Sequence, residues 1–377
     1  MKFSRHSSDL ASLMRNHKKL KPNHFINNIP VDVLEVMADH LPLESLLALT
    51  QTCKGLHAAL HHRLQSTAQK TSREELLECL FKVVRRRPDA WVCQECVKLH
   101  RANNNDTPHH AAPSCPHTRY IPLHCGPRSD TYELHHHHVQ LSIRLNRLRQ
   151  PTPMQREYLA RLLQQHTSTG FRMNPNNGFP NQLDVSFTLT PRIIEGRYLR
   201  KSTWTFSVLK DGPNAVTEDR IGAVALCCHL VTAPISHSND GSVVRSPQLS
   251  ALQHGLSNAL EGGYQCFGQC YFCAVDFLIT PGRENRTLMI EAWQDLGGEN
   301  NGSPGDETYW RAAAWDRNEM PIAHHMRRTR LIKRAGGTVR RSYGESRYFM
   351  TKGLVRWKNL AIHNYMADSL FYHPLMV

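Results

Sequence analysis

The spacing of apolar positions divides the chain into an N-terminal helical stretch and a longer stretch with strand periodicity. From residue 29 to residue 64, apolar residues recur at helical spacing and predict three short helices, the first of which opens at Pro30 and ends at Pro42. Three helices of this length seldom bury enough apolar area to be stable alone, because a segment of about 40 residues has too little interior. We therefore expect part of this apolar face to be covered by another polypeptide.

Strand periodicity governs most of the remaining chain. In residues 183–190, apolar Leu183, Val185, Phe187 and Leu189 alternate with polar residues, as in a half-buried strand. Further strands are predicted at residues 139–145, 193–199, 204–208, 271–279 and 287–293, and helices at residues 72–84 and 154–165. No repeat of fixed period is visible. The sequence therefore predicts an α+β protein, in which a three-helix module precedes an antiparallel, β-rich domain with a few helices.

The composition is that of a soluble globular protein. The chain has 377 residues, of which 40% are hydrophobic and 21% charged, and this length suits two or three domains. No apolar run reaches the roughly 18 residues that a membrane helix needs, and the N-terminus lacks the apolar region of a signal peptide. We therefore expect no membrane association and a cytoplasmic or nuclear location, or both.

The formal net charge of +14 favours association with polyanions. Basic residues are densest in residues 327–341, where no aromatic residue that could stack on a base is interleaved. This pattern favours a solvated tail or a nuclear-import-like address, and a specific nucleic-acid surface is the alternative.

Cysteine and histidine residues gather in two clusters. Eleven cysteines in an intracellular chain do not indicate disulfides, since the cytosol keeps thiols reduced. In the first cluster, a Cys-x-x-Cys motif precedes a Cys-Pro-His motif by 18 residues, a spacing at which two ligand turns converge on zinc. The predicted ligands are Cys93, Cys96, Cys115 and His117, with Cys125 and His100 as alternatives for the fourth position.

The second cluster combines Cys227 and His229 with Cys270 and Cys273, which form a Cys-x-x-Cys motif before a predicted strand. Both clusters would hold structural zinc, since four protein ligands leave no position for a substrate water. Reduced cysteines that pack as small apolar side chains are the competing interpretation of each cluster.

Four consecutive histidines occupy residues 135–138, directly before the strand predicted at residues 139–145. Only two of them can share one face of a strand, so they cannot form a four-ligand site by themselves. We expect partly exposed packing residues, with weak metal binding as the less favoured alternative.

Short motifs fall in a fixed order within the predicted helices: Ile29-Pro30, Asp32, Val33-Leu34, Leu41-Pro42-Leu43, Leu46-Leu47 and Cys53-Lys54. In this order they resemble the F-box, although many members of that family carry an aromatic residue where this chain has His57. The resemblance implies docking on a Skp-type adaptor, which bridges to a cullin. It assigns the contact to Ile29, Pro30, Val33, Leu34, Met37, Leu41, Pro42, Leu46, Leu47, Cys53, Leu56 and Leu60.

The Cys and His motifs extend this resemblance. An F-box followed by Cys-x-x-Cys-x-x-Leu-His, Cys-Cys-His and Trp-Gln-Asp-Leu-Gly is similar to filamentous-fungal F-box proteins of unassigned substrate. We expect a basic flexible N-terminus (residues 1–24), an F-box (25–66), a linker helix (67–92), a Cys/His-rich zinc segment (93–130), a β-rich substrate-binding domain (131–322) and a basic C-terminal segment (323–377).

No catalytic motif of fixed spacing is found, such as a Gly-rich phosphate loop ending in Gly-Lys or a His-Glu-x-x-His helix. We therefore expect a non-catalytic substrate receptor of a Skp-cullin-F-box ubiquitin ligase, which presents an unknown target protein. A zinc-containing nucleic-acid-binding protein is the alternative. On the first interpretation, truncation of Leu34 or Leu46 to alanine should weaken adaptor binding.

Overall fold

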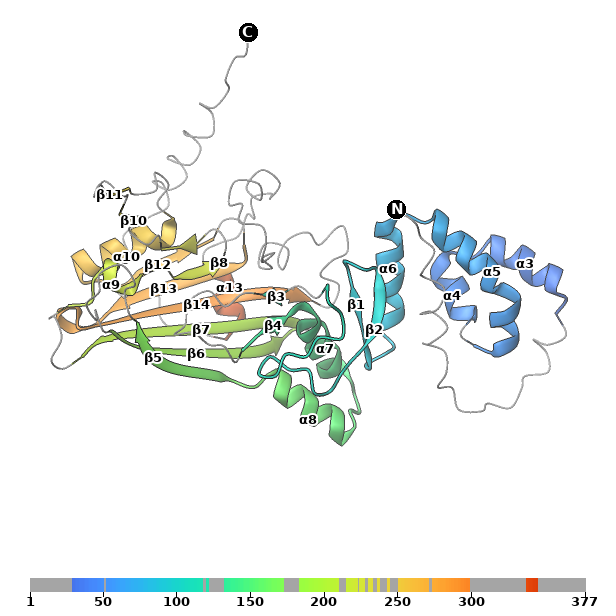
Figure 1. Ribbon diagram of the computed structural model, residues 1–377, viewed down its shortest axis with the longest axis horizontal. Coiled ribbons are helices and arrows are strands. Elements are labelled where there is room, and N and C mark those ends of the chain that lie inside the picture. The colour runs from blue at the N-terminus through green and yellow to red at the C-terminus, as the bar shows by residue number, and fades with distance from the viewer. Residues whose placement is uncertain are drawn as a thin grey trace, which may run out of the picture. The chain divides into compact units, whose positions relative to one another are not determined.

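The structure is a computed structural model that describes residues 29–50, 52–117, 120–121, 132–172, 183–209, 215–222, 224–227, 230–232, 236–237, 243–244, 250–270, 273–298 and 337–344. The chain divides into two compact units, Met1–His100 and Arg101–Val377 (Figure 1). The predicted flexible N-terminus, residues 1–24, lies outside the described residues.

The first unit begins with three helices, α3 (Val31–Asp39), α4 (Leu43–Thr50) and α5 (Lys54–Lys70). Pro42 separates the first two, and the Cys53 thiol before α5 accepts a hydrogen bond from the Leu56 N–H at 3.4 Å. Leucines from all three helices form one buried cluster, made of Leu34, Leu46, Leu47, Leu56, Leu60 and Leu64. The three predicted helices are confirmed.

Helix α6 (Arg73–Val84) follows with a two-stranded sheet, β1 (Ala90–Cys93) and β2 (Lys98–Arg101). A capping box begins α6: Ser72 and Glu75 each accept a hydrogen bond from the backbone N–H of the other. Phe81 and Val84 pack against Val92 of β1. The helix predicted at residues 72–84 is thus confirmed, and it is joined to a strand pair that the sequence pattern did not indicate.

A six-stranded antiparallel sheet forms the centre of the second unit (Figure 1). Its strands are β5 (His166–Arg172), β6 (Leu183–Ile194), β7 (Arg197–Val208), β12 (Cys266–Gln269), β13 (Val275–Pro281) and β14 (Thr287–Gly298), in the order β12-β13-β14-β7-β6-β5. Every neighbouring pair is antiparallel. The predicted antiparallel, β-rich architecture is confirmed, and the strands predicted at residues 183–190, 204–208 and 287–293 lie within β6, β7 and β14.

The strand predicted at residues 193–199 is wrong in its bounds, because it crosses a hairpin turn. Glu195 and Gly196 join β6 to β7, and their φ angles are +51° and +72°. A two-residue turn between antiparallel strands requires this left-handed backbone at both positions. Of the strand predicted at residues 271–279, the part from Val275 onward lies in β13, whereas residues 271–272 lie outside the described residues.

The strand predicted at residues 139–145 is a helix, α7 (His136–Arg147). All ten residues from 136 to 145 are buried, the polar ones included. Because polarity does not follow exposure here, the alternation of Val139, Leu141, Ile143 and Leu145 with polar residues does not mark a half-buried strand. Helix α8 (Pro153–Leu162) confirms the prediction at residues 154–165, and Thr152 forms a capping box with Gln155.

One face of the sheet is covered and apolar. Helices α7 and α10 (Ala251–Gly262) pack on it, together with the shorter elements α9 (Glu218–Ile221), β8 (Ala225–Cys227) and β9 (Leu230–Val231) (Figure 1). Phe187, Phe206 and Phe277 lie in this core. The remaining short elements are β3 (Tyr120–Ile121), β4 (Leu134–His135), β10 (Ser236–His237), β11 (Val243–Val244) and a 3-10 turn at Arg283–Asn285.

The other face carries hydroxyl side chains, and one end of it is covered by α13 (Thr338–Ser342). The Asp276 carboxylate accepts hydrogen bonds from the backbone N–H groups of Gly337 and Arg340, at 3.3 and 3.0 Å. The Arg340 guanidinium lies 4.6 Å from the centre of the Trp293 ring. Residues 337–344 are therefore packed against the sheet, so the end of the basic run at residues 327–341 is not a solvated tail; the rest of that run lies outside the described residues.

Candidate metal centres and docking helix

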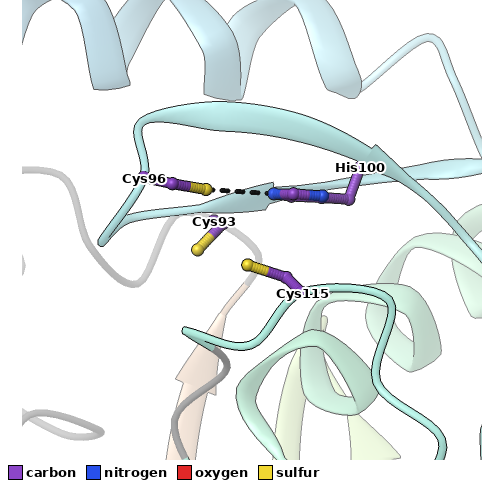
Figure 2. Close-up of side chains that lie close together, drawn as sticks. All are labelled: Cys93, Cys96, His100 and Cys115. Atoms are coloured by element: carbon purple, nitrogen blue, oxygen red, sulfur yellow. Dashed lines mark hydrogen bonds between the residues drawn. The ribbon is translucent and has the colours of Figure 1, made fainter. Parts of the chain in front are cut away.

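Three residues of the first Cys/His cluster come from the β1–β2 hairpin: Cys93 ends β1, Cys96 lies in the turn and His100 lies on β2. With Cys115, their ligand atoms all lie within 4.8 Å of one another (Figure 2). The Cys96 Sγ and the His100 Nε2 are 3.0 Å apart, and the Trp91 ring stacks on His100 with centres 4.7 Å apart. The hairpin thus holds three potential ligands in one place without needing the metal to gather them.

His117, which was predicted as the fourth ligand, is exposed and lies outside this cluster. His100 takes that position instead, because antiparallel pairing of β1 with β2 brings the second strand back beside the Cys-x-x-Cys turn. Cys125, the other alternative, lies outside the described residues. The signal available in the sequence was the short interval between Cys96 and His100, which suits a hairpin.

The second cluster joins the end of β8 to the turn between β12 and β13. Cys227, Cys270 and Cys273 are buried, and their sulfur atoms lie within 4.8 Å of one another. The Cys273 N–H donates a hydrogen bond to the Cys270 Sγ at 3.2 Å, and the Cys270 N–H donates to the Val275 carbonyl at 2.8 Å. The structure therefore brings together three of the four predicted ligands, and His229 lies outside the described residues.

Both clusters could hold a metal ion. A tetrahedral shell with metal–sulfur bonds of about 2.3 Å separates its ligand atoms by about 3.8 Å, which the clustered positions can reach with small side-chain rotations. Thiolate and imidazole groups favour soft or borderline ions over Mg²⁺ and Ca²⁺. In contrast, Cys79 is buried among leucines of the helical unit, where burial, followed by the charge of Glu44, raises the pKa of its thiol to about 11 and keeps it protonated.

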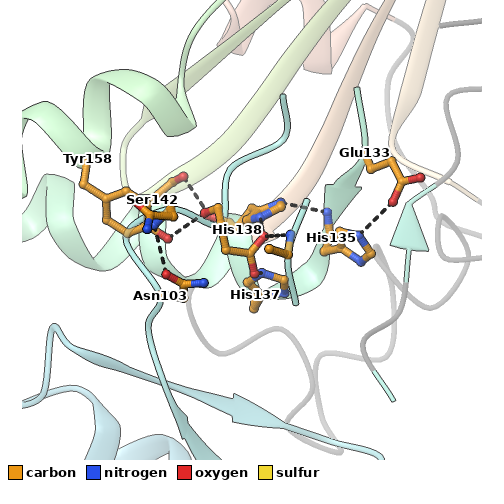
Figure 3. A network of polar contacts seen from close by, with 10 residues as sticks. Asn103, Glu133, His135, His137, His138, Ser142 and Tyr158 are labelled. Atoms are coloured by element: carbon orange, nitrogen blue, oxygen red, sulfur yellow. Dashed lines mark hydrogen bonds and ion pairs between the residues drawn. The ribbon is translucent and has the colours of Figure 1, made fainter. Parts of the chain in front are cut away.

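A third group, Asp106 with His137 and His138, is buried and also has ligand-like spacing (Figure 3). The Asp106 carboxylate lies 2.8 Å from the His137 Nε2 and 3.0 Å from the His138 Nε2, and it accepts a hydrogen bond from the Ala112 N–H at 2.9 Å. The His135 N–H donates to the His138 Nδ1 at 3.1 Å. His138 therefore carries its proton on Nε2, where a metal would have to bind, and the group is better explained as a hydrogen-bonded anchor than as a metal site.

The histidines at residues 135–138 are all buried, so the prediction of partial exposure is wrong. It failed because they begin a buried helix and not an exposed strand end. Burial, and secondarily the neighbouring His137, lowers the pKa of His138 to about 3. Although burial opposes it, hydrogen bonds from His137 and His138 hold the pKa of Asp106 well below its ordinary value.

The residues that the F-box resemblance assigns to adaptor contact separate into two groups. Leu34, Leu46, Leu47, Leu56 and Leu60 are buried among the helices of their own unit. This corrects the assignment of all five to a docking surface, because side chains that fill the module's own core are not presented to a partner. Ile29 and Leu41 are half-buried, whereas Pro30, Val33, Met37, Pro42 and Cys53 are exposed.

An apolar stripe remains on the outer side of α3. Val33, Val36 and Met37 lie at positions i, i+3 and i+4 and are 48%, 60% and 46% exposed, and Val31 beside them is 52% exposed. The inner side of the same helix buries Leu34 and Ala38. Helix α3 is thus apolar on both sides, and Val31 and Val36 extend the stripe beyond the residues predicted from the sequence.

The sequence matches no protein-family model, and no curated protein or solved structure proves similar to it. Among the helices of the described residues, none is long and apolar enough to cross a membrane. Function must therefore be inferred from the geometry of the clusters and of α3.

Proposed function

We propose that the protein is a non-catalytic substrate receptor of a Skp-cullin-F-box ubiquitin ligase, and that the outer stripe of α3 docks on the Skp-type adaptor. The observation that carries this proposal is the two-sided apolar character of α3. A solvent-facing helix ordinarily has a polar outer face, since exposed apolar side chains gain nothing in water. Valine and methionine side chains grouped outside a small module mark a protein-binding surface.

Charged side chains border the stripe. Arg63 of α5 forms ion pairs with Glu35 at 3.8 Å and with Asp39 at 3.1 Å, both on α3. These exposed pairs contribute little free energy, but they lie beside the stripe as a polar rim lies around the apolar centre of an interface. The order of motifs that resembles the F-box supports a Skp-type adaptor as the partner.

The two thiolate clusters would hold zinc in this proposal. Cys93, Cys96, His100 and Cys115 form a Cys₃His set, and Cys227, Cys270 and Cys273 provide three ligands of the second site. Complete shells of this kind are structural and leave no open position for catalysis. The protein's contribution to ubiquitin transfer would be proximity, since tethering a target near the ligase raises its effective concentration.

Titration of a purified Skp-type adaptor with the full chain tests the proposal. The double variant Val33→Glu, Met37→Glu should weaken binding by about tenfold to a hundredfold per lost side chain, because each buried aliphatic contact is worth roughly 1.5–3 kcal/mol. Met154→Glu is the matched control, since Met154 is also an exposed apolar side chain but lies on α8. Equal adaptor affinity of wild type and the α3 variant would rule out this docking surface.

The salt dependence of binding distinguishes adaptor docking from the alternative function, nucleic-acid binding. Binding driven by phosphate contacts should fall by roughly 10³–10⁵ between about 50 and 200 mM salt, whereas docking through aliphatic side chains should change little. The burial of Arg340 against Trp293 removes part of the basic run from the surface, which weakens this alternative.

A further inference from the structure

The six-stranded sheet ends differently at its two edges. At one edge, β12 has four residues and packs beside α10, and its Gly268 lies against the Phe277 ring. At the other edge, β5 has seven residues, and no strand of the described chain pairs with its outer side (Figure 1). Proteins usually protect sheet edges with short strands, proline, or lysine. The first edge has such protection, whereas β5 contains neither proline nor lysine.

The hydroxyl of Ser168 on β5 has an unused hydrogen-bonding capacity. Ser168 lies in the middle of the strand, opposite Phe187 of β6. Its Oγ is buried and forms no hydrogen bond with any described residue. A buried hydroxyl without a partner costs about 1–3 kcal/mol, so a strand that offered one at this edge would be favoured.

The sequence of β5 is self-complementary about Ser168. A two-fold axis through this residue would pair β5 antiparallel with β5 of a second copy, with Ser168 opposite Ser168, Thr167 opposite Thr169, and His166 opposite Gly170. Directly opposite residues have Cβ atoms about 4.5–5.5 Å apart, which lets facing hydroxyl groups form hydrogen bonds. Thr167 and Thr169 are exposed in the single chain and would form two threonine pairs across the axis.

We propose that the outer edge of β5 binds β5 of a second copy of this chain and makes a two-fold symmetric dimer with one continuous sheet. The absence of lysine, arginine, aspartate and glutamate from residues 166–170 is consistent with self-pairing, because a charge near the axis would approach its own copy. The facing Ser168 hydroxyl groups satisfy each other, which supplies the missing hydrogen-bond partner.

Sedimentation velocity of the full chain across the micromolar range tests this dimer. The variant Thr167→Lys, Thr169→Lys places lysine opposite lysine twice and should weaken dimerisation by about tenfold or more. The matched variant Thr167→Lys, Thr169→Glu places lysine opposite glutamate twice and should dimerise like wild type. Both variants change the same two exposed positions, and thermal unfolding verifies that both remain folded.

Wild type that stays monomeric at high micromolar concentration would overturn the proposal, and would leave the edge to a different partner. Dimerisation that is unchanged in both variants would overturn it as well, because the interface would then lie elsewhere. Equal weakening of both variants would contradict the two-fold register about Ser168. The proposal is supported only if the lysine–lysine variant loses dimerisation and the lysine–glutamate variant keeps it.

Discussion

The helical unit leaves a group of apolar side chains exposed, whereas the sheet unit covers its apolar face. In the helical unit, α3 buries Leu34 inward and exposes Val33, Val36 and Met37 outward. In the sheet unit, α7 and α10 cover the apolar face, and the opposite face carries threonine and serine, such as Thr188 paired with Thr203. Among the described residues of the sheet unit, the exposed large apolar residues are Met154 on α8 and Tyr264 in the loop between α10 and β12.

This difference follows from geometry. A helix in a single layer of helices has two sides and only one neighbouring layer, so residues on its outer side are buried only if another protein covers them. An antiparallel sheet covered on one side needs only one apolar face, and its other face can be polar. The apolar residues on the outer side of α3 therefore suit the docking that we propose, whereas the apolar face of the sheet is covered within the chain.

The largest expected effect concerns the metal that would stabilise the sheet unit. Structural zinc contributes on the order of 10 kcal/mol to folding, comparable to the stability of a whole domain. Cys270→Ser should therefore abolish zinc at one site, measured by elemental analysis, and strongly lower the unfolding temperature of the sheet unit.

Cys266→Ser is the matched control, because Cys266 is buried nearby on β12 but lies outside the thiol cluster. Its zinc content should equal that of wild type. The same zinc content and stability in both variants would show that the cluster is a group of packed thiols and not a metal centre.

The second-largest effect distinguishes a buried residue of the helical unit from an exposed one. Leu46 is fully buried, so Leu46→Ala should lower the free energy of unfolding of the helical unit by about 2–5 kcal/mol. Met37→Ala changes an exposed side chain and should alter stability by no more than about 0.5 kcal/mol, while it weakens adaptor binding. Urea titration followed by circular dichroism measures both, and equal destabilisation would contradict the division into a core side and a docking side.

The smallest effect is a pH dependence confined to the sheet unit. Burial lowers the pKa of His138 to about 3, whereas an unfolded histidine titrates near 6.5. Between these values the unfolded chain binds a proton that the folded chain does not. The free energy of unfolding should therefore fall as the pH falls below about 6.5, by up to about 1.4 kcal/mol per pH unit for this imidazole.

His138→Gln keeps a side-chain donor toward Asp106 and removes the titrating group. Urea titrations at pH 7 and near pH 5 should show a smaller loss of stability in this variant than in wild type. An identical pH dependence in both proteins would show that His138 is not responsible.

Local patterns were sufficient to predict much of the fold. The helices of the first unit, helix α8 and the alternation in β6 all depend on residues close together in the chain. The prediction failed in α7, where polar and apolar residues are buried alike, and where two residues with positive φ turned the chain between β6 and β7. Helix α10 and strand β5 were not predicted at all.

The candidate sites show the same limit. The Cys-x-x-Cys motifs marked both thiol clusters, because two ligands of each come from a single turn. The choice of His100 over His117 depended on strand pairing, and the role of Asp106 depended on contacts with residues more than thirty positions away. Such distant partners leave no periodic signal.

By itself, the sequence determined which segments form the helical module, where the central strand alternates, and which cysteines come in pairs, since these are properties of neighbouring residues. Only the tertiary structure decided which leucines fill the module and which valines remain outside, that His137 and His138 are buried beside Asp106, and that β5 is the last strand of the sheet among the described residues. These outcomes depend on which elements pack together. Such packing joins residues far apart in the chain, and the spacing of neighbouring residues does not specify it.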